Sequence, residues 1–293
     1  MRWSLLLLLC AVAATARGDV GGHPLTLWRV DGNANAIYLL GSIHLLRPED
    51  HPLPRAIDAA YEEAEVVVME LDMDDLDPAR TQAAFNSAGV MTDGTTLKDL
   101  MGEEHYRSAE EAAAAIDVPL DMLAQSEPWL AAITVELMML YRLGFNPVLG
   151  VEMTMTQRAM ADGKPIEGLE TVDEQLGFLD GLPLEAQREL LLQTLLQGAA
   201  LNETIDTLIE AWRHGDTATL EAELLQDLEA QDDLHEALIV SRNRRWAETI
   251  ASWLEDERDY LVVVGALHLV GDQGVPSLLD QAGFEIRQLK EQP

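Results

Sequence analysis

The sequence predicts an α/β fold in which the N- and C-terminal parts of the chain form a largely parallel central sheet. Uninterrupted runs of Val, Ile and Leu cluster near both ends of the chain, and helix-like segments separate them. Strands buried on both faces of a parallel sheet have this composition. Between about residues 97 and 257 the pattern is mainly helical, which predicts a large helical insertion. We therefore expect residues 17–293 to form a single α/β domain.

Near the N-terminus, two apolar runs flank the turn-rich segment "DGNAN", which is typical of a hairpin. A helix and a third strand follow, so the expected elements are Leu25–Val30, Ala36–Gly41, Pro54–Ala64 and Glu65–Leu71. Near the C-terminus, the pattern predicts a strand, a helix and a last strand at Asp259–Ala266, Val275–Gly283 and Phe284–Leu289. Both ends of the chain thus supply strands to one sheet.

The middle of the chain predicts helices at Glu127–Leu143, Leu184–Ala200, Asn202–His214, Thr217–Leu228 and Leu234–Leu254. The first of these is the most apolar, but Glu136 and Arg142 within it indicate a core helix and not a membrane span. Short elements at Asn146–Glu152 and Lys164–Thr171 are expected to add strand ends.

The first residues, "MRWSLLLLLCAVAATARGD", predict a cleaved export signal over residues 1–16. Arg2 gives a charged start, Leu5–Ala14 form a short apolar stretch, and Ala14-Thr15-Ala16 offer small residues for cleavage. A membrane span needs ~20 apolar residues, so the mature chain is expected to be periplasmic or secreted, without a stable span. Cys10 is the only cysteine, and its removal excludes disulfides, cysteine nucleophiles and thiolate metal sites.

The charge of the chain is strongly negative, because 19 basic and 52 acidic side chains give a formal net charge of −33. Such a surface repels nucleic acid and anionic lipid, so we exclude nucleic acid as a partner. The sequence carries no signal for an oligomeric state.

One short phrase occurs near each end of the chain. "YLLGSIHLL" and "VVVGALHLV" are apolar runs in which a Gly is followed three positions later by a His, as Gly41 and His44 and as Gly265 and His268. Ligands gather outside the carboxyl ends of parallel strands, and Gly allows a close approach there. If the two strands are neighbours, His44 and His268 converge on one site.

A third strand carries Glu70 at its end. A carboxylate at the end of a buried strand is costly unless it is paired or binds a cation. Together with His44 and His268, it would form a familiar ligand set for a divalent metal with open positions, although Mn²⁺, Co²⁺ and Zn²⁺ are not distinguished. The alternative for each histidine, taken alone, is a structural residue at a strand end whose polar atoms are hydrogen-bonded.

Further candidates have less specific contexts. Glu152 ends "NPVLGVE" and Glu170 lies in "IEGLET", and each is a candidate metal ligand, general base or plain surface carboxylate. Arg242 and Asn243 lie within a predicted helix, where Arg can clamp a carboxylate or stabilise an oxyanion, or belong to an exposed basic face. Ser42 lacks a nucleophile-elbow motif. We assign it to substrate binding with the two motif glycines, Gly41 and Gly265.

Five blocks of the sequence resemble the TraB/GumN family, which is related to the Tiki metal-dependent proteases. The matching blocks are "LLGSIHLLRPEDHPLP", "EVVVMELD", "GLETVDEQLGFLDGLP", "LIVSRNRRWAETI" and "VVVGALHLVGDQGVPSLLDQAGFEI". The resemblance implies a centre formed by the two G-x-x-H histidines and a strand-end glutamate. It marks Gly41, His44, Glu70, Gly265 and His268, with Arg242 and Asn243 as support. Tiki proteins cleave secreted signalling proteins, and TraB-type relatives antagonise peptide pheromones.

These observations lead us to expect an exported metal-dependent hydrolase, a peptidase acting on secreted or periplasmic peptides or proteins. His44, His268 and Glu70 would hold the metal, and Glu152 or Glu170 would be the base. Arg242 would steady the substrate or an oxyanion, with Asn243 beside it. The peptidase activity comes only from the resemblance. The alternative is a non-catalytic periplasmic binding protein that sequesters a peptide or haem. Hydrolysis requires a base near the metal in addition to the ligands, which discriminates the two.

Overall fold

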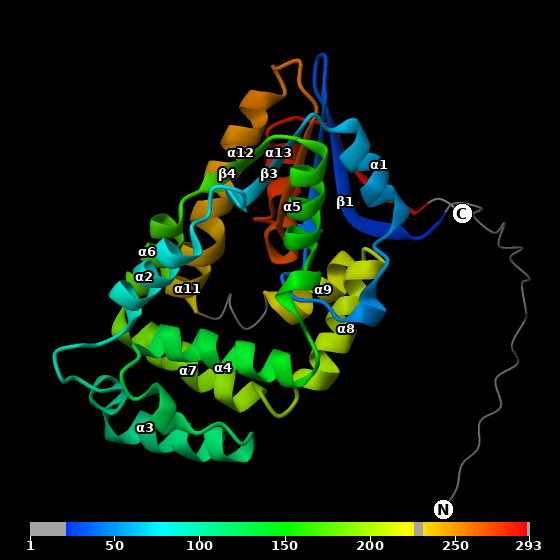
Figure 1. Ribbon diagram of the computed structural model, residues 1–293. Helices are drawn as coiled ribbons and strands as arrows, with labels where there is room; N and C mark the ends of the chain where they lie inside the picture. Colours follow the sequence, from blue (N-terminus) through cyan, green and yellow to red (C-terminus); the bar gives the residue numbers. More distant parts are fainter. Residues whose placement is uncertain (1–21, 226–230, 292–293) are drawn as a thin grey trace, which may run out of the picture.

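The computed structural model describes residues 22–225 and 231–291, so the predicted export signal lies outside the described residues. In this part of the chain, six strands form one sheet in the order β4-β3-β5-β2-β1-β6 (Figure 1). The strands are β1 (Pro24–Asp31), β2 (Ala36–Ser42), β3 (Val66–Leu71), β4 (Ile166–Glu170), β5 (Tyr260–Gly265) and β6 (Ile286–Lys290). The α/β prediction is confirmed.

The sheet is mostly parallel. β4, β3, β5 and β2 pair in parallel, whereas β1 pairs antiparallel with both β2 and β6. The predicted hairpin therefore joins β1 to β2. The edge strand β4 comes from the middle of the chain, so the two ends do not supply the sheet alone.

Both faces of the sheet are buried, which explains its uninterrupted apolar runs. In β5, Leu261 and Val263 belong to a core packed under α1 (Arg55–Glu63), α5 (Val151–Asp162), α8 (Leu201–Arg213) and α9 (Thr217–Leu224). The alternate residues of β5, Tyr260, Val262 and Val264, belong to a second core under α12 (Ser241–Trp253) and α13 (Val275–Gln281). Helices thus cover the central strands from both sides.

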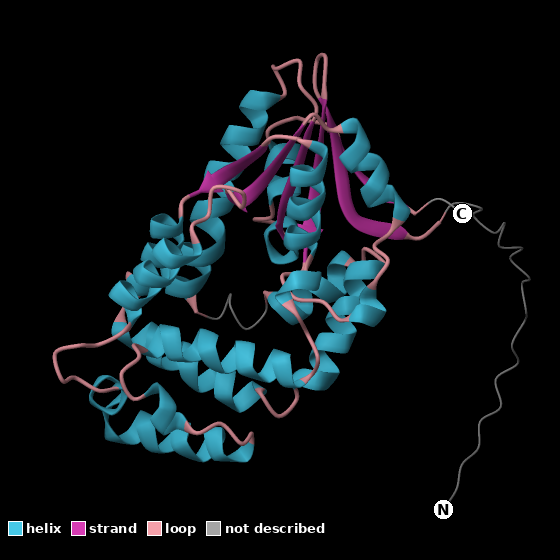
Figure 2. Cartoon of the chain, viewed as in Figure 1, coloured by secondary structure: helices cyan, strands magenta, loops and turns pink. Residues whose placement is uncertain are grey.

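A helical layer lies beyond the carboxyl ends of the parallel strands (Figure 2). It contains α3 (Leu97–Ala115), α4 (Pro128–Arg142) and α7 (Leu184–Gln197), which share a third apolar core. α2 (Pro78–Gly89) and α6 (Val172–Asp180) connect it to the sheet. Within residues 22–225 and 231–291, no helix combines the length and apolar character that crossing a membrane requires.

Two predicted elements differ from the structure. Asn146–Glu152 was expected to add a strand end, but only Asn146 forms an isolated bridge, to Leu46. The Asn146 side chain accepts a hydrogen bond from the Val148 N–H, Pro147 begins a 3₁₀ turn, and α5 starts at Val151. Capping by Asn and a Pro at the first helical position favour this helical start.

Leu234–Leu254 was expected to form one helix, but its α-helical hydrogen bonding is interrupted. α11 (Asp232–His235) leads into a π-helical turn at Glu236–Val240, and α12 follows. Such turns are rare and often lie near functional sites. Here the turn directly precedes Arg242.

Candidate active site

Three neighbouring parallel strands deliver the predicted histidines and glutamate to one edge of the sheet. β5 lies between β2 and β3, and Ser42 at the end of β2 pairs with Gly265 at the end of β5. His44 follows β2 by two residues, His268 lies in the 3₁₀ turn after β5, and Glu70 is the penultimate residue of β3. His44 and His268, which are 224 positions apart in the chain (268 − 44 = 224), therefore lie at the same edge of the sheet.

The three side chains surround the α-carbon of Gly265. A Cβ atom at position 265 would lie 3.3 Å from Glu70 Oε1, 3.5 Å from His268 Cδ2 and 4.0 Å from His44 Nε2. The Gly265 N–H donates a hydrogen bond of 2.8 Å to Glu70 Oε1. The missing side chain of Gly265 therefore leaves a space that faces all three groups.

Glu152 joins this centre through His44. Its Oε1 lies 2.6 Å from His44 Nδ1 and also accepts a hydrogen bond from the buried Ser42 hydroxyl. The start of α5 is anchored here, because the Val151 N–H donates to the Ile43 carbonyl, and Gly150 packs closely against the His44 backbone. Glu152, in the first turn of α5, is thereby held against the imidazole.

The contact between His44 and Glu152 shifts the pKa of both groups. Attraction to the Glu152 carboxylate raises the pKa of His44, although the imidazole is 63% exposed and solvent screens part of the effect. Burial alone would raise the pKa of Glu152, but His44 outweighs it and the pKa is lowered. Among the described residues, Glu152 Oε2 is buried and lacks a hydrogen-bond partner. The carboxylate is therefore ionised and has one unused oxygen.

His268 is held as a neutral imidazole with a defined tautomer. Its Nδ1 lies 2.7 Å from Asn243 Oδ1, and Asn243 Nδ2 donates to the Gln273 carbonyl, which fixes the orientation of the amide. Arg242 Nη1 lies 3.2 Å from His268 Nε2 and can only donate, so we assign the proton to Nδ1. Burial lowers the pKa of His268 to about 3. The Nε2 lone pair thus accepts the Arg242 N–H.

Arg242 forms a buried ion cluster with two carboxylates. Its Nη2 lies 2.8 Å from both Glu70 Oε2 and Glu170 Oε2, and its Nε lies 3.1 Å from Glu170. Burial alone would raise the pKa of Glu70, but the Arg242 and His44 cations and the Gly265 N–H hydrogen bond lower it. Arg245 adds a hydrogen bond of 2.8 Å to Glu170 from the surface side. These contacts give both carboxylates charged partners inside the protein.

Most of the residues singled out from the sequence meet at this centre, but in different roles. Gly41 lies apart from it, since its carbonyl accepts the Trp212 indole N–H and a Cβ atom there would lie 3.1 Å from Ala266 Cα. Ser42 is buried and holds Glu152, and Asn243 holds His268. Gly41, Ser42 and Asn243 therefore support the centre without lining its cavity.

Sequence reasoning missed Gln175 in α6. Its side-chain N–H group donates to Glu70 Oε2 at 3.1 Å and to Glu170 Oε2 at 3.4 Å, so it bridges the ends of β3 and β4. The available signal was its place five residues after Glu170 in the block "GLETVDEQLGF". Arg245 was also missed, although it lies one helical turn after Arg242 on the same face of α12.

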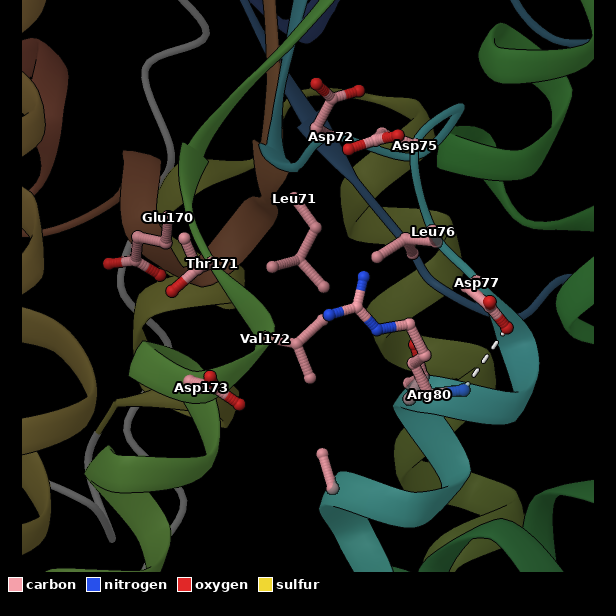
Figure 3. A pocket seen from close by; sticks show the side chains of 12 residues that line it. Leu71, Asp72, Asp75, Leu76, Asp77, Arg80, Glu170, Thr171, Val172 and Asp173 are labelled. Carbon is pink, nitrogen blue, oxygen red and sulfur yellow. Dashed lines mark hydrogen bonds between the residues drawn. The ribbon is translucent and has the colours of Figure 1, made fainter.

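Two cavities open beside the centre, and Leu71 lines both. The methionine cavity has a volume of about 230 Å³ and is lined by His44, Met69, Glu70, Leu71, Met73, Pro147, Glu152, Met153 and Gln175. The outer cavity, of about 420 Å³, lies between the ends of β3 and β4 and the start of α2. In Figure 3, Leu71, Leu76 and Val172 point into the outer cavity around the Arg80 guanidinium, while the Glu170 carboxylate points away.

The residues of the centre suit a divalent cation in donor type. Within the described residues, no group of three His, Cys, Asp or Glu side chains is already close enough to hold a metal ion, and His268 Nε2 lies 4.0 Å from Glu70 Oε1. Glu70 Oε1 and His44 Nε2 face the space above Gly265, where His268 presents Cδ2. Each imidazole is held through Nδ1 by an oxygen, as metal-binding histidines usually are. Glu152 lines the adjoining cavity, and its second carboxylate oxygen is buried without a hydrogen-bond partner in the described part of the chain.

The chain is similar to known proteins over most of its length. The sequence model of the TraB/PrgY/gumN family matches residues 26–288. Two relatives, from Shigella flexneri and Escherichia coli K12, are each named "Uncharacterized protein YbaP". Each is 23% identical over 279 residues, which cover 91% of this chain and 96% of the relative. No solved structure matches significantly.

Proposed function

The chain belongs to the TraB/PrgY/gumN family, and on that premise we propose that it is an exported, metal-dependent hydrolase that cleaves peptides. The observation that carries the proposal is the meeting of His44, Glu70 and His268 around Gly265, with the unused Glu152 oxygen beside them. Metal-assisted hydrolysis needs metal ligands and a separate base. The centre offers two imidazoles and a buried carboxylate as ligands, and a further carboxylate as the base.

His44 Nε2, His268 Nε2 and Glu70 Oε1 would hold the cation. A divalent ion such as Mn²⁺, Co²⁺ or Zn²⁺ at this place supplies Lewis acidity for a substrate carbonyl and lowers the pKa of a bound water. His44 must lose its Nε2 proton to serve as a ligand, so protons and the cation compete for it. The Arg242 N–H group that now donates to His268 Nε2 must also release that lone pair.

The contacts favour Glu152 over Glu170 as the general base. Glu170 already accepts hydrogen bonds from Arg242, Arg245 and Gln175. Glu152 engages His44 and Ser42 through Oε1 alone, which leaves Oε2 to accept a proton from water. A base must reach the proton that it abstracts, and Glu152 lines the methionine cavity where a substrate would lie.

Arg242 acts in this proposal as a positioning residue and not as an oxyanion donor. Its guanidinium has five N–H donors, and its three nitrogens contact Glu170, Glu70, His268 and the Leu238 carbonyl. These contacts leave little donor capacity for an oxyanion. The guanidinium instead holds Glu70 and His268 in one orientation.

Cleavage of a mixed peptide library tests the proposal. The mature protein is treated with a chelator and assayed before and after addition of Mn²⁺, Co²⁺ or Zn²⁺. We expect cation-dependent cleavage, and we expect Glu152→Gln to lower kcat by ~10²–10⁴-fold, the usual contribution of a general base. Glu104→Gln, an exposed site in α3, is the matched control and should retain the wild-type rate. Peptide binding without cleavage under every condition would contradict hydrolysis and favour a sequestering role.

A further inference from the structure

We propose that the methionine cavity binds an apolar side chain of the substrate, so that the enzyme cleaves peptides next to residues such as Leu, Ile, Met or Phe. This inference rests on the proposed function, because it identifies the substrate class of the same centre. It depends on the composition of the cavity walls, on the pairing of the charges there, and on the cavity size.

The cavity has one polar wall and several apolar ones. The polar wall is formed by the side chains of the centre, namely His44, Glu70, Glu152 and Gln175. The other lining residues are apolar: Met69 and Leu71 at the end of β3, Met73 after it, Pro147 in the 3₁₀ turn and Met153 in α5. Met153 directly follows Glu152, so the base and an apolar wall lie on the same helical turn. A side chain entering here would contact hydrocarbon and thioether groups while the backbone faces the polar wall.

The charges on the polar wall disfavour a charged occupant. Glu70 and Glu152 would repel an acidic side chain, and the nearest cations, Arg242 and His44, are already paired with them. Among the described residues, a basic side chain would find only the Glu152 oxygen that the proposed base needs, and it would otherwise lie against methionines. Burying a charge without a dedicated partner is costly, whereas an apolar side chain gains by leaving water.

The size of the cavity fits a side chain and not a large ligand. Its volume of about 230 Å³ lies below the ~300–1,000 Å³ of typical small-molecule sites, which disfavours haem there. Methionine side chains are flexible and adapt to occupants of different shape. The outer cavity of Figure 3 is larger, but its wall carries Arg80 and several aspartates, and Glu152 is not among its lining residues. The side chain beside the scissile bond is therefore assigned to the methionine cavity.

Matched quenched-fluorescence peptides test the inference. The peptides differ at one residue, which is Leu, Gly, Lys or Asp. We expect the Leu peptide to have the highest kcat/KM. Met73→Ala should lower the Leu-to-Gly ratio of kcat/KM about tenfold, since small apolar contacts discriminate by roughly 10–200-fold, and Met73→Leu should restore most of it. Met160→Ala is the matched control, because Met160 lies on α5 with Met153 but is 61% exposed.

Calorimetric binding of the same peptides to Glu152→Gln separates this inference from the proposed function. Preferential binding of the Leu peptide without any wild-type cleavage would support the cavity assignment and contradict hydrolysis. Cleavage with no side-chain preference, or with a preference for Lys or Asp, would overturn the assignment while leaving hydrolysis in place. An unchanged Leu-to-Gly ratio in Met73→Ala, or failure of every peptide both to bind and to be cleaved, would also overturn it.

Discussion

Ser42 and Gly265 lie opposite each other on adjacent parallel strands, although 223 positions (265 − 42 = 223) separate them in the chain. The two G-x-x-H phrases repeat at an offset of 224, so they are staggered by one residue in the sheet. Gly265 consequently lies under the centre, whereas Gly41 pairs with Val264 and packs against Thr26 and Ala266. The two motif glycines therefore have different roles: Gly265 leaves space at the centre, and Gly41 packs inside the fold.

Replacing these glycines by alanine should separate their roles. Gly265→Ala adds a methyl group 3.3 Å from Glu70 Oε1 and 3.5 Å from His268, so it should abolish cation binding and cleavage while the protein stays folded. Gly41→Ala meets Thr26 Cγ2 at 2.5 Å and should destabilise the fold by about 1–3 kcal/mol through overpacking. Urea unfolding and cation titration of both variants check this. Equal losses of stability would contradict the distinction.

Removing the guanidinium of Arg242 should destabilise the protein strongly. Arg242→Met leaves Glu70 and Glu170 buried without their main partner, which typically costs about 3–5 kcal/mol. Arg245 also contacts Glu170 but is 47% exposed, so Arg245→Met should cost less than about 1 kcal/mol. The free energy of unfolding of each variant is the measurement. Similar values for both would show that the buried cluster is not held by Arg242.

Acid should remove a contribution of Asp256 to stability. The Tyr260 hydroxyl donates to this carboxylate and, with the Glu257 N–H and Arg258, lowers its pKa from 3.8 to about 2. A lowered carboxyl pKa stabilises the folded state above the unfolded pKa, and this stabilisation disappears as pH falls towards 2. Wild type should therefore be more stable than Asp256→Asn at pH 6, and most of this difference should be lost by pH 2.

Urea midpoints of the two proteins across this pH range check the expectation. In a Tyr260→Phe background, the effect of Asp256→Asn at pH 6 should be smaller, because the main donor is absent. A difference between wild type and Asp256→Asn that persists unchanged to pH 2 would mean that the Asp256 charge is not responsible.

The strands and the central residues could be predicted because their signals are local. The apolar run of β5 and the G-x-x-H phrase lie within ten residues, and parallel pairing then brings His44 and His268 together. Glu152 was placed at a strand end because its helical start depends on Asn146 capping and on the docking of Gly150 against His44. Docking between distant segments leaves no periodic pattern in the sequence.

The positioning residues were harder to predict for the same reason. Gln175 contacts Glu70, which lies 105 positions away (175 − 70 = 105), and only its place five residues after Glu170 marks it in the sequence. Arg242 could be singled out, but its role could not be assigned, because a basic residue in a helix looks the same whether it is buried with two carboxylates or exposed. Burial of Arg242 and Glu170 depends on the packing of α12 against the sheet.

Cation stoichiometry tests the central claim most directly. Metal-free protein is dialysed against Co²⁺, and the bound cobalt per chain is measured for wild type, His44→Ala and His214→Ala. His214 is a control because its side chain is 46% exposed and contacts Glu210 outside the centre. The account predicts about one bound ion per chain in wild type and His214→Ala, and none in a folded His44→Ala protein, since it would lack one of three ligands. Wild-type protein that binds no cation, or His44→Ala protein that binds as much as wild type, would contradict a metal site formed by His44, Glu70 and His268.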